Sequence, residues 1–336
     1  MRSTCSVYVD VGYLLASAAT RVTGTSLRAS IHVEFSKLVE SLVAEAEKKS
    51  GLPVLRVHWY DSAKNGVPDV QQERIGELAK VKLRLGRFGV DGQQKGVDLR
   101  IGLDLVAHAR NGAADVFFLV TGDDDLTEAV EEAQVHGVQV VVVAVPNADG
   151  KPHGVSRHLV RAADELDVLS GELIDNAVMK VEVPRPVIPV PVPAPPVTSA
   201  AAAAPAATKG TAAAPSPLDV ASIARHPTTA PIAPSAVLAY SAQTGGRSQL
   251  MPGYDDDLED YDEQIDGVAS RVLTAFRRSA STADVLDLRR GKPSIPRDID
   301  RALLLDASDA LGMYDVSEHI RYRLRERFWQ QLDLQP

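Results

Sequence analysis

Short runs of apolar residues punctuate the first 180 positions of this chain. Runs in which neighbouring residues are apolar, without strict alternation, are typical of strands buried on both faces of a sheet. The pattern predicts strands at Ser6–Asp10, Val54–Trp59, Lys82–Arg87, Val116–Val120 and Val138–Val145.

Longer segments with helical spacing separate these runs. Val97, Ile101, Leu105 and His108, for example, fall on one side of a helix. Alternating strands and amphipathic helices favour a parallel sheet covered on both faces, so residues 1–180 are expected to form a three-layer α/β/α domain. The predicted helices are Val33–Lys49, Gln71–Leu78, Gly96–Arg110, Asp124–His136 and Ser156–Ala163.

The composition changes sharply near residue 181. From Val181 to about Pro234 the chain consists mainly of Pro, Ala, Val and Thr, and an acidic run occupies 255–263. Proline removes backbone donors and alanine offers little surface to bury, so no core is expected here. Residues 181–264 are therefore predicted to be a disordered Pro/Ala-rich linker with a solvated acidic run.

A helical, arginine-rich C-terminal domain is predicted over residues 265–336. Its last helix places Val316, Ile320, Leu324 and Phe328 four residues apart, and Asp315 with Glu318 forms a plausible N-terminal cap. Two interpretations of its polar face stay open: the solvated face of a small domain, or a basic surface for phosphates or a protein partner. The residues concerned are Arg321, Arg323, Arg325 and Arg327.

Composition narrows the class of protein. A length of 336 residues allows about two domains. The single cysteine, Cys5, excludes an internal disulfide framework and a cysteine zinc cage, which favours a cytoplasmic protein. Neither a signal peptide nor a membrane-spanning stretch is expected. The net charge of −9 argues against a nucleic-acid coat but not against a local nucleic-acid site.

Aspartates follow two of the predicted strands. Asp10 ends the first strand, and Asp123, Asp124 and Asp125 follow Val116–Val120. Asp98 lies in the first turn of the helix Gly96–Arg110. Ligands bind at the carboxyl ends of strands in open parallel sheets, and clustered carboxylates repel one another unless a cation lies between them. The pattern indicates a site for a hard divalent cation, Mg²⁺ or Mn²⁺.

Each aspartate has a simpler explanation when taken alone. Asp123 or Asp124 could cap the following helix, Asp98 could interact with its own helix dipole, and Asp10 could serve a turn. A shared cation explains them together. Asp104 lies six residues after Asp98, about 120° around the helix, so it is expected to be an outer-shell or structural residue.

Three segments resemble the motifs of NYN domains, a branch of the PIN-like nuclease superfamily that includes LabA-like bacterial proteins. They are Asp10 after its strand, Lys95-Gly-Val-Asp98, and Thr121-Gly-Asp-Asp-Asp125-Leu, and the resemblance covers roughly residues 4–170. It implies a metal-dependent nuclease that usually acts on RNA. Its catalytic and metal-binding set would be Asp10, Asp98, Asp123 and Asp125, while Asp124 would point away.

Two further positions carry substrate-binding expectations from the resemblance. Lys95 heads the second motif and could contact a phosphate. Tyr13 stands where the family's first motif usually has Asn, and its hydroxyl both donates and accepts, although its reach is longer than that of the amide. The departure leaves open a catalytically weak or inactive domain that binds RNA or protein. A protein partner for the linker or C-terminal helices, and a homo-oligomer, also stay open.

Other enzyme classes fit less well. Asp123-Asp-Asp-Leu-Thr127 matches the nucleophile string of haloacid-dehalogenase phosphatases but does not follow the first strand. That first strand is not followed by the glycine-rich turn of a dinucleotide-binding domain. No histidine arrangement supports serine or cysteine nucleophilic catalysis. The resemblance to NYN domains, together with the aspartate pattern, therefore implies a metal-dependent ribonuclease.

Overall fold

The structure, a computed structural model, describes residues 3–63, 66–88, 94–182, 261–313 and 316–334. All of these belong to one compact unit that comprises residues 1–185 and 253–336. Most of the predicted linker and the predicted capping residue Asp315 lie outside the described residues.

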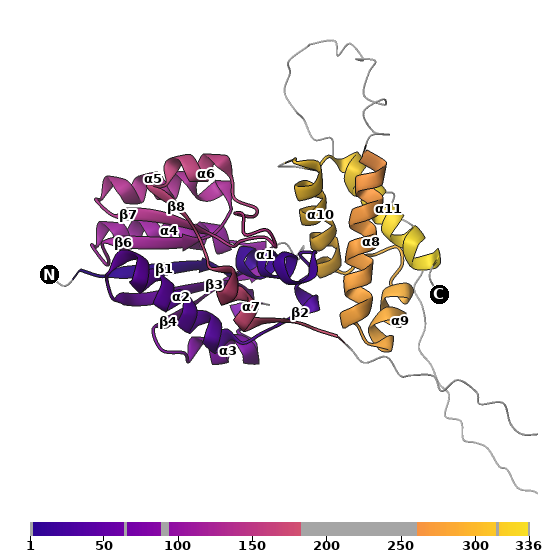
Figure 1. Ribbon diagram of the computed structural model, residues 1–336, viewed down its shortest axis with the longest axis horizontal. Helices are drawn as coiled ribbons and strands as arrows, with labels where there is room; N and C mark the ends of the chain where they lie inside the picture. Colours follow the sequence, from indigo (N-terminus) through magenta and orange to yellow (C-terminus); the bar gives the residue numbers. More distant parts are fainter. Residues whose placement is uncertain (1–2, 64–65, 89–93, 183–260, 314–315, 335–336) are drawn as a thin grey trace, which may run out of the picture. The chain divides into compact units, whose positions relative to one another are not determined.

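The central element is a sheet with six parallel strands in the order β4-β3-β1-β6-β7-β8 (Figure 1), and its parallel character is as the sequence predicts. A short seventh strand, β5 (Gln94–Lys95), pairs antiparallel with β4 at one edge. The chain runs outward from β1 in both directions, so the strand order reverses there. The parallel strands are β1 (Cys5–Asp10), β3 (Val54–Ala63), β4 (Val81–Phe88), β6 (Val116–Val120), β7 (Gln139–Ala144) and β8 (Glu165–Val168).

Helices cover both faces of this sheet (Figure 1). On one face Val7, Val9 and Val57 pack in a core with α1 (Val11–Thr23), α2 (Phe35–Ser50) and α7 (Gly171–Ala177). On the other, Tyr8, Phe117 and Leu119 pack against α4 (Val97–Arg110), α5 (Thr127–Val135) and α6 (Arg157–Ala162). The predicted three-layer α/β/α architecture is confirmed.

Every strand and helix predicted in this region is present, within a few residues of the predicted bounds. The helix predicted at Gln71–Leu78 is α3 (Val70–Gly76). The helices α1 and α7 and the strand β8 were not predicted. A two-stranded antiparallel sheet of β2 (Ile31–Val33) and β9 (Val178–Lys180) was not predicted either.

The C-terminal helices are α8 (Asp262–Ser279), α9 (Thr282–Arg290), α10 (Arg297–Leu311) and α11 (Glu318–Leu334). They share an apolar core in which Ile320, Leu324 and Phe328 of α11 are buried at the predicted helical spacing. Val316 is buried in the same core but precedes α11, which begins at Glu318, so the last helix starts later than predicted. No helix among the described residues is long and apolar enough to cross a membrane.

The chain after α1 packs into this helical core. Leu27 is fully buried among its apolar side chains and directly precedes the 3-10 helix η1 (Arg28–Ser30). The buried backbone N–H of Ser26 donates to Asp306 Oδ1 of α10 at 2.9 Å. These contacts tie the C-terminal helices to the first 30 residues of the α/β domain.

Three of the four arginines singled out on the last helix pair with carboxylates of neighbouring helices. Arg323 lies 2.6 Å from Asp262, and Arg325 lies 2.7 Å from Asp300. Arg327 pairs with the same Asp262 and with Asp266. Much of the basic face predicted on α11 is therefore engaged in holding the helices together.

Candidate active site

Asp10 marks the carboxyl edge of the sheet at the point where the strand order reverses. It is the last residue of β1 and the N-cap of α1, and its Oδ1 accepts a hydrogen bond from the Tyr13 backbone N–H at 3.2 Å. Val9 is level with Val120 of β6, which places Thr121 beside Asp10. The Thr121 hydroxyl donates to Asp10 Oδ2 at 3.4 Å. These contacts fix a carboxylate that is only 8% exposed.

The second acidic segment follows β6. Asp123 is the N-cap of the 3-10 helix η3 (Asp124–Leu126), and its Oδ1 accepts from the Asp125 backbone N–H at 3.1 Å. Asp125 itself is exposed. Asp124 is turned toward α6, where it accepts a hydrogen bond from Ser156. The prediction that Asp124 points away from its neighbours is consistent with this contact.

Asp98 occupies the first turn of α4. The helix begins after Gly96, whose φ of 89° lies in the left-handed region that glycine adopts readily. The approach of the helix start to the sheet depends on a second glycine. A Cβ on Gly86 of β4 would lie 2.5 Å from a methyl carbon of Val97 and 3.1 Å from its backbone nitrogen. This close packing sets the position of Asp98 relative to the strand ends.

Burial and mutual repulsion raise the pKa of three of these carboxyls. Burial and the charge of Asp98 raise the pKa of Asp10 to about 6. Burial, then Asp125, raises the pKa of Asp98. Burial, followed by Asp98 and Asp125, raises the pKa of Asp123. Asp98 is thus electrostatically coupled to the other three members of the predicted set.

The four carboxylates interact electrostatically, but they do not form a closed shell of metal ligands. Among the described residues, no three His, Cys, Asp or Glu side chains are close enough together to hold a metal ion as they stand. The donor chemistry nevertheless fits a hard divalent ion, since oxygen ligands that repel one another gain most from a cation between them. The assignment of Asp10, Asp98, Asp123 and Asp125 as metal ligands stays a prediction.

Two arginines lie beside Asp10, and neither was singled out from the sequence. A methyl group on Gly12 would lie 2.9 Å from Asp10 Oδ1 and 3.2 Å from a guanidinium nitrogen of both Arg28 and Arg301. Arg28 also donates to the Gly12 carbonyl oxygen at 2.9 Å. Both arginines act to lower the pKa of Asp10, although burial and Asp98 outweigh them.

Tyr13 uses its hydroxyl to hold a loop. The hydroxyl donates to the His153 carbonyl oxygen at 2.7 Å and accepts from the Val145 backbone N–H at 3.1 Å. Substrate binding by this hydroxyl would require one of these bonds to be exchanged, and the predicted role stays a prediction. The Lys95 side chain lies outside the described part of the structure, so its predicted phosphate contact also stays a prediction.

Gly122, in the third motif, allows this loop to approach the aspartates. A Cβ there would lie 1.8 Å from the Gly154 carbonyl oxygen and 2.8 Å from a ring carbon of Tyr13. The Gly122 carbonyl oxygen accepts from the Ser156 backbone N–H at 3.0 Å. Tyr13, Gly122 and the 145–156 loop therefore form one packed support behind Asp10 and Asp123.

Asp104 makes structural contacts, as predicted. It accepts from the Tyr60 hydroxyl at 3.0 Å and pairs with Arg84 Nε at 3.1 Å. The neighbouring Tyr8 hydroxyl lies 2.9 Å from His108 Nδ1, and burial lowers the pKa of His58 to about 3. An uncharged His58 is suited to its buried position on β3, beside Tyr8 and His108. Arg84 is thus engaged by Asp104.

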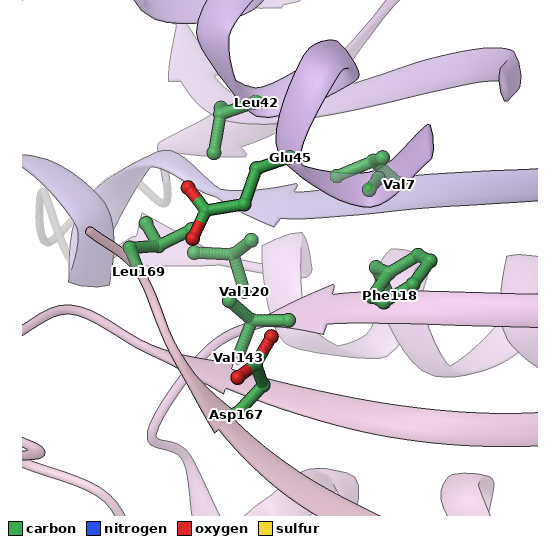
Figure 2. Close-up of a pocket in the computed structure, with 9 residues that line it drawn as sticks. Val7, Leu42, Glu45, Phe118, Val120, Val143, Asp167 and Leu169 are labelled. Atoms are coloured by element: carbon green, nitrogen blue, oxygen red, sulfur yellow. The ribbon is translucent and has the colours of Figure 1, made fainter. Parts of the chain in front are cut away.

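A separate small cavity lies between α2 and the sheet (Figure 2). It has a mainly apolar lining that includes Val7, Phe118 and Val143, with the carboxylates Glu45 and Asp167 beside it. Glu45 accepts from the Ser170 backbone N–H at 3.0 Å, and Asp167 pairs with Lys49 at 2.7 Å. The carboxylates are thus used structurally, and the lining includes none of the four predicted ligands.

Comparison with known proteins assigns the α/β domain. Residues 4–169 match the family model of the NYN domain. A stretch of 101 residues is 37% identical to the uncharacterized protein y4oD of Sinorhizobium fredii (strain NBRC 101917 / NGR234). The match covers 30% of this chain and 47%, about half, of that relative. No solved structure gives a significant match. Residues 4–169 are therefore an NYN domain of the PIN-like superfamily, as the motifs predict, and have a nuclease-like fold.

Proposed function

We propose that this protein is a metal-dependent ribonuclease whose reaction takes place at the Asp10 edge of the NYN domain. The observation that carries the proposal is the coupling of Asp10, Asp98 and Asp123. Burial and nearby carboxylates raise the pKa of each, as expected where a cation normally offsets their repulsion. NYN domains are generally nucleases that bind RNA, which supports both the reaction class and the substrate.

Two of the four carboxylates, Asp10 and Asp123, are oriented by hydrogen bonds within the chain. Asp10, Asp98, Asp123 and Asp125 would hold Mg²⁺ or Mn²⁺, which when bound would activate water and offset negative charge on the phosphodiester. The Tyr13 N–H and the Thr121 hydroxyl orient the two oxygens of Asp10. The Asp125 N–H orients Asp123. Preorganisation of this kind reduces the rearrangement needed when substrate arrives.

Tyr13 favours one alternative function. Its hydroxyl is bonded to two backbone groups of the 145–154 loop, and the position lacks the amide usual in the family motif. An NYN domain that binds RNA or protein without cleaving RNA is therefore the second candidate.

The test compares cleavage of a labelled single-stranded RNA by the wild-type chain, Asp123→Asn and Asp124→Asn, with Mg²⁺ or Mn²⁺ and with EDTA. The two variants remove one charge from neighbouring residues, but Asp124 faces Ser156 and His158. We expect Asp123→Asn to lower the rate at least about a hundredfold and Asp124→Asn to lower it far less.

The possible outcomes separate the two candidates. Cleavage that persists in EDTA, or an Asp123→Asn protein as active as wild type, would refute the metal mechanism. Absence of cleavage with intact RNA binding would favour the binding function.

A further inference from the structure

A groove beside α10 carries positive charge and apolar surface together. Arg297, Arg301 and Arg321 line it, and Leu304 and Val316 supply apolar surface. One acid, Asp300, also contributes to the lining, but its carboxylate is held by Arg325 through two hydrogen bonds of 2.7 and 2.8 Å. We call the surface made by Arg297, Arg301, Leu304, Val316 and Arg321 the α10 groove. The arginines of this groove suit backbone phosphates, and its apolar side chains can pack against the faces of bases.

Arg301 connects this groove to the aspartates. It lines the groove, and one of its guanidinium nitrogens would lie 3.2 Å from a methyl group on Gly12. Its charge also lowers the pKa of both Asp10 and Asp98. The C-terminal helices therefore bring a cation to the edge where the NYN domain has its candidate site.

Arg28 places a second cation next to the first. Its guanidinium is fixed by the Gly12 carbonyl oxygen at 2.9 Å, and burial followed by the charge of Arg301 lowers its pKa. The charges of Asp61, Asp10 and Asp298 offset part of the repulsion between the two guanidinium groups, and a further anion beside both of them would offset more. A phosphate is such an anion, and the planar fork of arginine matches its oxygens.

We propose that the α10 groove carries the backbone of a single-stranded RNA away from the Asp10 edge. Arg28 and Arg301 bind the phosphate next to the one at the aspartates, and Arg297 contacts a phosphate further along. Arg321 borders the groove but is held by the Val316 carbonyl oxygen at 2.7 Å and by Glu318 at 3.7 Å. This inference rests on the proposed function, because it takes the aspartate edge as the place where RNA is cut. It makes the C-terminal helices part of the substrate-binding surface.

The experiment measures RNA binding separately from cleavage. The full chain carrying Asp123→Asn is titrated with a fluorescent single-stranded RNA at several salt concentrations. It is measured alone and with Arg301→Gln, Arg301→Lys, Arg297→Gln or Arg28→Gln added. Arg290→Gln on α9 is the control, because it removes the same charge from an exposed position outside the α10 groove lining. Arg301 is also exposed, so its substitution removes little packing.

We expect Arg301→Gln to weaken binding about tenfold, which corresponds to loss of a charged hydrogen-bond partner. The slope of log affinity against log salt should fall by about 0.7, the value for one phosphate contact on a single strand. Arg301→Lys should keep most of the slope, and Arg290→Gln should change neither quantity. A matching loss in Arg28→Gln would support the paired phosphate contact.

Binding and salt slope unchanged in both Arg301→Gln and Arg297→Gln would overturn the proposal. So would a loss confined to the cleavage rate of the wild-type background, because Arg301 would then act only through the charge of Asp10. An Arg301-dependent salt slope in a chain that cleaves no RNA would support the groove while the ribonuclease proposal failed. Normal RNA cleavage by the wild-type chain, with a salt slope that Arg301→Gln leaves unchanged, would support the ribonuclease proposal and refute the groove proposal.

Discussion

The carboxylate at the end of β1 should lower the stability of the metal-free protein. Asp10 is 8% exposed, and its pKa is raised from 3.8 to about 6. A carboxyl that binds its proton more tightly in the folded state stabilises that state in acid, and this contribution is lost as pH rises through the folded pKa. At pH 7 the ionised Asp10 therefore opposes folding. We predict that Asp10→Asn increases the free energy of unfolding in EDTA.

The magnitude follows from the pKa change. One pKa unit corresponds to 1.36 kcal/mol, so the shift corresponds to about 3 kcal/mol at pH 7. This figure already includes the attraction of Arg28 and Arg301, since both contribute to the folded-state pKa. At pH 5 most of the folded Asp10 is protonated, and the advantage of the Asn variant should shrink to about half of that value. Asparagine can keep the bonds to Tyr13 N–H and Thr121.

Urea unfolding of wild type and Asp10→Asn at pH 7 and pH 5, with EDTA throughout, measures both values. Asp104→Asn is the comparison, because it removes a carboxylate that pairs with Arg84 at 3.1 Å and should lower stability at both pH values. An Asp10→Asn protein no more stable than wild type at pH 7 would refute the reasoning. An advantage that grew on acidification would refute it as well.

Two further predictions concern Tyr13 and Gly122, which support the aspartates. Tyr13→Phe removes the hydroxyl's hydrogen bonds to His153 and Val145 and should lower the free energy of unfolding, measured in urea, by about 2 kcal/mol. RNA cleavage should be retained; loss of cleavage at unchanged stability would instead give the hydroxyl a chemical role. Gly122→Ala places a methyl 1.8 Å from the Gly154 carbonyl oxygen and should cost about 3 kcal/mol and reduce metal-dependent cleavage. Wild-type stability and activity in this variant would contradict the packing described.

The parts of the fold that the sequence predicted are those with a repeating pattern. Strands buried on both faces carry continuous apolar runs, and the helices between them repeat every three or four residues. The helix α1 was not predicted because small residues such as Ala18 and Ala19 form much of its buried face. β8 contains Glu165 and Asp167 and is only four residues long. The β8 segment carries no strong apolar period.

Only the part of the candidate site that follows from the order of the strands was predicted. Parallel strands end at one edge, so Asp10 and Asp123 could be placed together from their positions after two strands. Arg28 lies in a 3-10 turn and Arg301 lies in a helix of the C-terminal segment, far along the chain. No local spacing connects them with Asp10. The contact arises from packing of Leu27 and Ser26 against the C-terminal helices.

Because of this packing, the NYN domain and the C-terminal helices share a core at residues 25–27. Residues 25–27 fall within the NYN match, yet Leu27 is fully buried in the core of the C-terminal helices and Ser26 is bonded to Asp306. A C-terminal segment transplanted onto another NYN domain would therefore need a compatible counterpart to this short stretch. During evolution, residues 25–27 and the C-terminal helices should therefore change together. A polar residue in place of Leu27 would require a change in the helices that bury it, and loss of the Asp306 carboxylate would require a new partner for the Ser26 N–H. The C-terminal helices are in this sense a matched part of the domain whose loop they bury.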